Sequence, residues 1–194
     1  ACTAANRIYV QKSIADQFTK EFSQAMSQLK MGKGTDTGIQ LGASVSVKER
    51  NKIAELVDNS VKAGAKVLTG GKTPDGPGAF YPATVLEVDK SAEILNHEVF
   101  GPVAPVVIFE TDAEAIELAN STDFGLISYV YSEDLKRAIQ ISEALESGMV
   151  AINRGMISDP AAPFGGVKQS GLGREGGFDG IHEFLETKYI GVEI

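Results

Sequence analysis

Three stretches of the sequence carry residues that could do chemistry, and the first lies at the start of the chain. Cys2, within ACTAANR, is the single cysteine among 194 residues. A thiol placed where a helix begins meets unpaired backbone N–H groups, which stabilise a thiolate and an oxyanion formed beside it. The residues TAANR can begin such a helical turn, so covalent attack on a carbonyl is one interpretation of Cys2. An inert, small hydrophobic side chain is the other, and it is the commoner role of a free cysteine.

The second stretch, NHEVFGPV, places a carboxylate between a polar turn and a buried segment. Glu98 could accept hydrogen bonds from the hydroxyl groups of a ligand, with Phe100 as an apolar wall beside it. A solvated loop carboxylate without a function gives the same pattern and is more common. Spacing alone leaves both interpretations open.

The third stretch, PFGGVKQSGLGREGG, belongs to a long loop that follows Asn153. Loops of this length within compact domains are usually functional or disordered. The glycines fit neither the G-x-G-x-x-G pattern nor a P-loop, so Gly171 and Gly173 are interpreted as turn residues rather than as a phosphate site. Phe164 lies in the middle of the loop and is interpreted as the wall of a pocket.

The composition is that of an ordinary globular domain, with 43% hydrophobic and 23% charged residues. The net charge of −8 argues against nucleic acid or an anionic membrane as a partner, because both are bound through basic patches. No apolar run is long enough to span a bilayer. One cysteine and two histidines make a poor zinc site, so no metal is expected. These features predict a soluble, cytoplasmic domain.

Hydrophobic periodicity predicts the elements that position these residues. Helices are predicted over residues 13–30, 46–64, 111–120, 132–148 and within 178–186. Strands are predicted over residues 7–11, 65–71, 81–88, 103–109, 126–132, 149–153 and 187–194. Ser46 and Glu49 form a capping box, and Leu135, Ala138, Ile139 and Leu145 are expected to point inward from their helix. The alternation predicts an α/β fold with a largely parallel open sheet and flanking helices.

Taken together, the three stretches resemble the aldehyde dehydrogenase superfamily. The family's nucleophilic cysteine is followed by an alanine two positions on and an arginine five positions on, as in Cys2, Ala4 and Arg7. The family motif E-x-F-G-P-V matches residues 98–103, and P-F-G-G-x-K-x-S-G-x-G-R-E matches residues 163–175. The motifs occur in the family's order, and the resemblance covers the whole chain.

The resemblance implies a domain organisation. Residues 1–183 would be most of the catalytic domain, and residues 184–194 would be a strand that joins the oligomerisation region of a homo-oligomer. The dinucleotide-binding domain, the general-base glutamate and an oxyanion-hole asparagine would lie upstream of Cys2 and are absent from the chain. We therefore expect this chain alone to be inactive, with a frayed segment around Cys2.

The resemblance also implies a chemistry. The Cys2 thiolate would attack an aldehyde, a hydride would pass to NAD or NADP, and water would hydrolyse the resulting thioester to a carboxylate. Glu98 would bind the nicotinamide ribose, Phe100 would pack beside the nicotinamide, and Phe164 would line the aldehyde tunnel. The residues that discriminate NAD from NADP would lie outside the chain.

The loop before P-F-G-G and the C-terminal segment are most similar to those of succinate-semialdehyde dehydrogenases, in which a loop serine contacts the substrate carboxylate. Ser158 is the matching residue, and Arg154 is a less favoured second candidate because the family's usual arginines lie upstream. Ala4 stands where several relatives carry a second cysteine, which excludes an intramolecular disulfide switch of that type. Two alternatives remain, namely another aliphatic or non-phosphorylating aldehyde dehydrogenase and a non-catalytic module that binds a ligand or partner.

Overall fold

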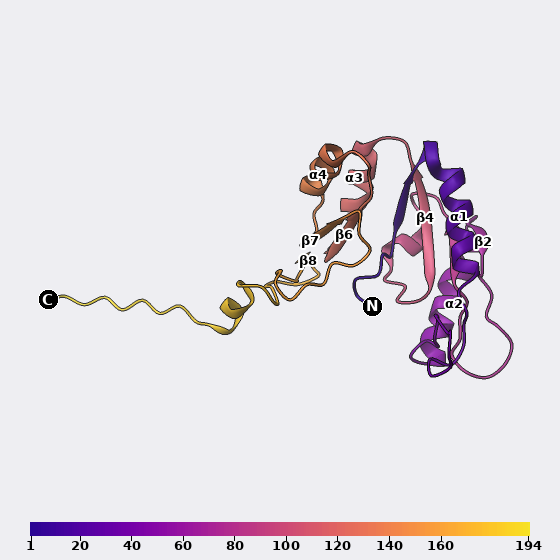
Figure 1. Cartoon of the computed structure of the whole chain (residues 1–194), viewed down its shortest axis with the longest axis horizontal. Coiled ribbons are helices and arrows are strands. Elements are labelled where there is room, and N and C mark those ends of the chain that lie inside the picture. The colour runs from indigo at the N-terminus through magenta and orange to yellow at the C-terminus, as the bar shows by residue number, and fades with distance from the viewer. The chain divides into compact units, whose positions relative to one another are not determined.

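The computed structural model describes residues 1–194 and divides into two compact units, Ala1–Leu118 and Ala119–Ile194. Figure 1 shows the helices and strands of each unit. None of the helices combines the length and the apolar character that crossing a bilayer requires.

The first unit is built on a four-stranded sheet with the order β1-β4-β3-β2. The strands are β1 (Ile8–Gln11), β4 (Val103–Phe109), β3 (Thr84–Glu87) and β2 (Lys66–Thr69). The strands β1, β4 and β3 run parallel, and β2 pairs antiparallel with β3 at one edge. This confirms the predicted largely parallel sheet. The central strand β4 is apolar throughout because helices cover both faces of the sheet.

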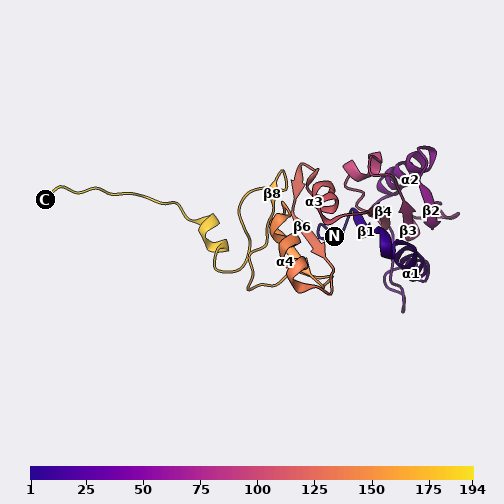
Figure 2. The same ribbon diagram turned by 90° about the horizontal axis from the view of Figure 1, so that it is seen from above.

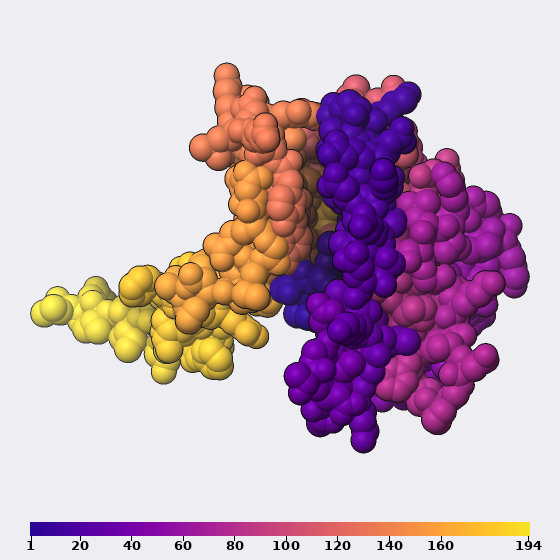
Figure 3. Space-filling view, turned by 45° about the vertical axis from the view of Figure 1, so that its right-hand side comes forward, coloured from indigo at the N-terminus to yellow at the C-terminus, as the bar shows by residue number.

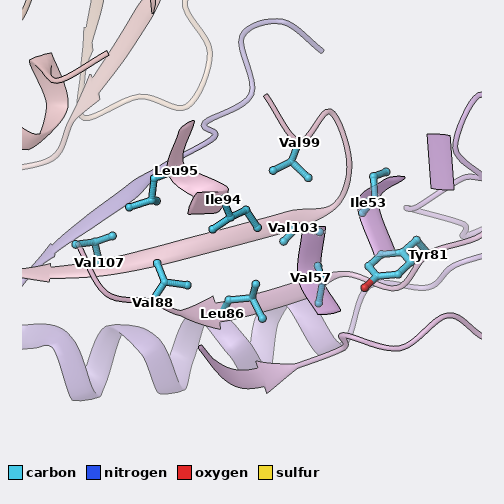
Figure 4. Close-up of a cluster of buried hydrophobic side chains, with 10 residues drawn as sticks. All are labelled: Ile53, Val57, Tyr81, Leu86, Val88, Ile94, Leu95, Val99, Val103 and Val107. Atoms are coloured by element: carbon cyan, nitrogen blue, oxygen red, sulfur yellow. The ribbon is translucent and has the colours of Figure 1, made fainter. Parts of the chain in front are cut away.

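Two layers of helix bury the two faces of this sheet (Figure 2). On one face, α1 (Ala15–Ser27) packs over a cluster that includes Val85 and Val106. On the other, α2 (Val47–Lys62) and the short helix η2 (Glu93–Asn96) enclose a cluster that includes Leu86 and Val107. Figure 4 shows this second cluster, and Figure 3 shows α1 (indigo) as an outer layer of the unit. Neighbouring residues of β3 and β4 therefore serve opposite faces, as the pleat of a strand requires.

Local capping residues mark the helix ends of this unit. Half of the predicted capping box forms, since the Ser46 hydroxyl is engaged while the Glu49 carboxylate pairs with Lys52 at 2.8 Å. The Ser46 hydroxyl accepts a hydrogen bond from the Glu49 backbone N–H at 3.2 Å and begins α2, and Gly64 follows the helix with a φ of +104°. A 3-10 turn, η1 (Lys12–Ile14), leads from β1 into α1. The helix α3 (Asp112–Asn120) begins where the Thr111 hydroxyl accepts from the Glu114 N–H at 3.3 Å.

The second unit contains two separate two-stranded sheets. In one, β6 (Ile127–Val130) and β7 (Met149–Ile152) run parallel, and in the other β5 (Phe124–Gly125) pairs antiparallel with β8 (Val167–Lys168). The helix α4 (Leu135–Ala144) connects β6 to β7.

The predicted inward face of α4 is wrong in part. Ala138 is fully buried, but Leu135 and Ile139 are 62% and 44% exposed, and Leu145 lies beyond the end of the helix and is half-buried. The sheet of β6 and β7 is only two strands wide, so it covers the centre of the helix and leaves the flanks of its apolar stripe open.

The C-terminal segment also differs from the prediction. The short 3-10 helix η3 (Gly180–Phe184) forms within the predicted range 178–186, but residues 185–194 form no strand (Figure 1). A strand needs backbone partners, and this single chain offers none to that segment.

Candidate functional site

Cys2 lies on the surface, in a turn that precedes β1. The turn is closed by a 3.0 Å hydrogen bond from the Ala4 N–H to the Ala1 carbonyl, and the chain does not continue into a helix. The expected helical start is thus limited to one turn. The thiol is exposed and free, so it is accessible to an electrophile.

Asn6 joins the Cys2 segment to the loop that carries Glu98. The Asn6 side-chain oxygen accepts a hydrogen bond from the Val99 backbone N–H at 2.9 Å. Its side-chain nitrogen donates to the His97 carbonyl, on the other side of Glu98. Two segments that are far apart in the sequence therefore form one surface of the first unit.

The loop around Glu98 is anchored by its neighbours. Val99 is only 5% exposed and packs in the cluster drawn in Figure 4. Gly101 packs against Ile53 so closely that an added Cβ would lie 2.4 Å from the Ile53 side chain. Because these two residues face the core, Glu98 and Phe100 are left on the outside.

Glu98 and Phe100 both have the accessibility that a ligand contact needs. The Glu98 carboxylate is exposed and has no partner within the chain. Phe100 is 66% exposed and adopts a φ of +46°, a conformation that is rare for a bulky residue and often marks functional sites. An open carboxylate beside an open aromatic ring suits a ligand with hydroxyl groups and a flat ring.

Arg7, the arginine of the first motif, has a structural role. Its guanidinium lies 5.9 Å from the centre of the Tyr9 ring and donates to the Leu118 carbonyl at 3.4 Å. The Tyr9 hydroxyl donates to the same carbonyl at 3.1 Å. Burial raises the pKa of Tyr9, and the charge of Arg7 partly offsets that shift. Arg7 and Tyr9 thus fix the path of α3 beside β1.

The substrate candidates of the second unit lie in the loop that follows β7. Ser158 is exposed, and its hydroxyl has no partner within the chain. The Arg154 side chain folds back, with its Nε 2.5 Å from the Met156 carbonyl oxygen. Asn153 holds the start of the loop, because its side chain bonds both the N–H and the carbonyl of Ser132 at 2.9 and 2.8 Å. Arg154 is thus already engaged, whereas Ser158 is available.

Phe164 is held by backbone pairing. Its N–H and carbonyl each form a 2.7 Å hydrogen bond with Glu175, and its side chain is half-buried. The Arg174 guanidinium donates to the carbonyls of Gly166 and Gly173, both at 2.7 Å, and so braces the same loop from within.

The glycines of this motif act as turn residues. Gly171 and Gly173 have φ values of +111° and +81°, which few other residues adopt, so the turn interpretation is confirmed. Gly165 approaches the Gly173 backbone so closely that an added Cβ would lie 2.6 Å from its carbonyl oxygen.

The predicted site residues therefore divide between the two units. Cys2, Glu98 and Phe100 belong to the first, and Ser158 and Phe164 to the second. No group of three or more histidine, cysteine, aspartate or glutamate side chains is placed to hold a metal ion. Sequence reasoning missed Asn6, because nothing in the pattern ANR indicates a partner 91 residues away.

Comparison with known proteins places the chain in a family. Residues 1–190 match the model of the aldehyde dehydrogenase family, and the chain belongs to that family. It is 53% identical over 193 residues to a succinate-semialdehyde dehydrogenase of Paenarthrobacter nicotinovorans, covering 99% of this chain and 43% of that protein. It is 45% identical over 193 residues to a glutarate-semialdehyde dehydrogenase of Pseudomonas putida, covering 100% of this chain and 40% of that protein.

A solved structure agrees with the fold. A betaine aldehyde dehydrogenase point mutant from Staphylococcus aureus, in complex with NAD⁺ and with a BME-modified cysteine, superimposes with a TM-score of 0.93 at 40% identity. The match covers 98% of this chain and 40% of that chain. The chain thus has the α/β fold of aldehyde dehydrogenases and spans about two fifths of the length of the curated relatives it matches.

Proposed function

We propose that the whole protein is an NAD(P)-dependent aldehyde dehydrogenase that oxidises succinate semialdehyde to succinate. One observation carries this proposal. In the first unit, the Asn6 side chain links the segment of the exposed Cys2 thiol to the loop of the open Glu98 carboxylate. Cys2 is a nucleophile that can hold the substrate covalently, and Glu98 can accept hydrogen bonds from the ribose of a dinucleotide. Because their segments are joined, the two residues suit a reaction between that substrate and that cofactor.

The chemistry assigned to this chain begins at Cys2. Its sulfur would bond to the aldehyde carbon, and the carbonyl oxygen would become the oxyanion of a thiohemiacetal. Bound NAD(P)⁺ would supply the acceptor for the hydride that leaves this carbon, which converts the adduct to a thioester. Water would then add to the thioester carbonyl and release the carboxylic acid, while Cys2 recovers its thiol proton.

Glu98 and Phe100 would hold the cofactor. The free Glu98 carboxylate would accept hydrogen bonds from the nicotinamide ribose, and the exposed Phe100 ring would pack beside the nicotinamide. The general-base glutamate and the second oxyanion donor are expected upstream of this chain, so the isolated chain is expected to be inactive.

Ser158 and Phe164 would select the aldehyde. A free hydroxyl on the loop would bind the carboxylate at the far end of succinate semialdehyde, and Phe164 would line the path of its methylene groups. Glutarate semialdehyde is the second candidate substrate, because a relative named for it is 45% identical to this chain. The two aldehydes share both end groups and differ by one methylene.

The C-terminal segment would assemble the protein into a homo-oligomer. Tyr189, Ile190, Val192 and Ile194 are each at least 74% exposed. Unpaired backbone and exposed apolar side chains suit addition of this segment to a sheet of another subunit.

The experiment that tests the proposal is NAD(P)H formation by the whole protein with succinate semialdehyde, glutarate semialdehyde and an uncharged aldehyde of similar length. We expect turnover to fall by about a thousandfold or more in Cys2→Ala, because Cys2 supplies the sulfur of the proposed thioester. Ser158→Ala should raise KM about tenfold for the two carboxylate substrates only. Ser142→Ala is the matched control, since that hydroxyl bonds only within α4. Turnover that survives Cys2→Ala, or no turnover with any aldehyde, would overturn the proposal and favour a binding module.

A further inference from the structure

We propose that Asn6 is a positioning residue that sets the placement of the Glu98 carboxylate relative to the Cys2 thiol. This inference rests on the proposed function. Asn6 itself would touch neither the substrate nor the cofactor. It would act through the backbone on either side of Glu98.

The hydrogen-bond pattern of Asn6 is specific. A side-chain amide has a carbonyl oxygen that accepts and an NH₂ group that donates. The Val99 N–H needs an acceptor and the His97 carbonyl needs a donor, so the amide satisfies both at once. The Asn6 side chain thereby holds the backbone on both sides of Glu98. This restricts the direction in which the Glu98 side chain can point from the loop.

The rest of the loop is fixed to the core. Val99 inserts its side chain into the cluster of Figure 4, and Gly101 lies against Ile53. These contacts secure the loop on the sheet. The Asn6 amide adds two hydrogen bonds between this loop and the segment of the nucleophile, which is itself closed by a turn from Ala1 to Ala4.

The same pattern elsewhere in the chain serves as an internal comparison. The Asn120 side chain donates to the Ala144 carbonyl at 2.9 Å and accepts from the Glu146 N–H at 2.8 Å, and so brackets Leu145. These two hydrogen bonds hold the chain at the end of α4, and the residue between them, Leu145, is not ionisable. The pair of hydrogen bonds made by Asn6 differs in two ways. It flanks an ionisable residue, Glu98, and it originates in the segment that carries Cys2.

Hydride transfer gives this link a function. The substrate carbon would be fixed to Cys2 and the nicotinamide ribose to Glu98, so the distance between donor and acceptor depends on how the two segments are held together. Misplacement of reacting groups by about 1 Å can cost about a hundredfold in rate. A link between the two segments sets this distance before the substrate arrives.

Two substitutions separate the parts of the link. Asn6→Ala removes both hydrogen bonds. Asn6→Asp has nearly the same shape and keeps the acceptor for the Val99 N–H, but it turns an oxygen toward the His97 carbonyl and loses the donor. We expect both variants to loosen Glu98 while leaving the Cys2 thiol chemically intact.

The experiment measures kcat, the KM values for NAD(P)⁺ and aldehyde, the Kd for NAD(P)⁺ and the melting temperature of the whole protein. For Asn6→Ala and Asn6→Asp we expect the KM and Kd for NAD(P)⁺ to rise about tenfold and kcat to fall about ten- to a hundredfold. The aldehyde KM should stay within about twofold, because the substrate loop belongs to other residues.

Two control variants isolate the effect. Asn96→Ala changes an exposed asparagine at the end of η2, just before the loop, whose side chain hydrogen-bonds to Glu93 at 3.4 Å, and it should change none of these quantities. Asn120→Ala removes the comparison bracket and should lower the melting temperature without moving the Kd for NAD(P)⁺. If Asn6 had only a structural role, Asn6→Ala would likewise lower the melting temperature and leave the Kd for NAD(P)⁺ unchanged.

A double-mutant cycle tests whether Asn6 acts through Glu98. If it does, Asn6→Ala should have little further effect on the Kd for NAD(P)⁺ once Glu98→Gln is present. Additive effects of the two substitutions, or a melting-temperature loss alone, would overturn the inference while wild-type turnover leaves the proposed function standing. A wild-type protein that neither binds NAD(P)⁺ nor oxidises any aldehyde would overturn both.

Discussion

The two units of this chain hold their candidate site residues by different means. In the first unit, helices cover both faces of a four-stranded sheet, and the apolar core clusters of the structure lie there. In the second, two narrow sheets bury few apolar side chains, namely Val130, Ala138, Met149 and Ala151. Hydrophobic burial therefore dominates the first unit, and the second depends more on polar and backbone contacts.

The two candidate loops show this difference in detail. The Glu98 loop is secured by the buried side chain of Val99. The Phe164 loop is secured by its two backbone hydrogen bonds to Glu175 and by the Lys168 ammonium, which bonds the carbonyls of Asn120 and Thr122 at 2.9 and 3.0 Å. A loop that is anchored by a buried side chain stays in place even when neighbouring segments move. A loop that is held by backbone hydrogen bonds needs glycine or another small residue wherever two backbone segments come close together.

The largest effect is expected from Leu86→Ala, in the core of the first unit. Leu86 is fully buried, so its truncation should lower the free energy of unfolding by about 2–5 kcal/mol. Leu135→Ala, on the exposed flank of α4, should change it by less than about 0.5 kcal/mol. Native-state hydrogen exchange of the whole protein, followed at the amides of β3, β4 and β6, measures both. A large loss of unfolding free energy in Leu135→Ala would contradict this contrast between the two units, because it would mean that the flank of α4 is buried.

An intermediate effect is expected from Gly148→Ala in the second unit. An added Cβ would lie 2.1 Å from the Gly165 carbonyl oxygen and 2.8 Å from the Gly166 Cα, and backbone atoms yield little. We expect a loss of about 1–3 kcal/mol, read from hydrogen exchange at the Gly148 and Met149 amides. Gly155→Ala is the control, because the nearest atom to its added Cβ is the Tyr131 hydroxyl oxygen at 3.5 Å. If both substitutions were harmless, the second unit would not depend on close backbone contact.

The smallest effect concerns Tyr81 and appears only at alkaline pH. Tyr81 is 1% exposed and its hydroxyl lacks a hydrogen-bond partner. Burial, followed by the negative charge of Asp58, raises the pKa of Tyr81 from 10.0 to about 12, and the neighbouring Thr84 side chain offsets only part of that shift. Between these values the unfolded chain loses the proton that the folded chain keeps, so stability is retained below pH 10 and falls as the pH rises toward 12.

Urea unfolding at about pH 8 and about pH 11 measures this dependence. We expect the first unit to lose about 1 kcal/mol or more at the higher pH, and Tyr81→Phe to remove most of that loss at little cost near neutrality. A smaller part should remain, because burial also raises the pKa of Tyr9 in the same unit. Tyr131→Phe, at a residue that is 66% exposed, should leave the loss in place. A loss that persists in full in Tyr81→Phe would assign the alkaline transition to another group.

The sequence by itself determined the elements whose signals are local. The Ser46 cap of α2, the wholly apolar β4 and the alternation of helices with strands were readable because they depend on neighbours in the chain. The ordered motifs around Cys2, Glu98 and Phe164 were enough to identify the family, because each motif is contiguous.

Tertiary structure alone decided which distant groups meet. The Asn6 side chain bonds the residues on either side of Glu98, which lie 91 or more positions away in the sequence. Periodicity and spacing patterns describe only residues that are near one another in the chain. The exposed flank of α4 has a similar cause, since the apolar stripe predicts a buried face but not the width of the sheet beneath it. The segment 187–194 alternates like a strand yet forms none here, because strand formation depends on a partner that its own residues do not specify.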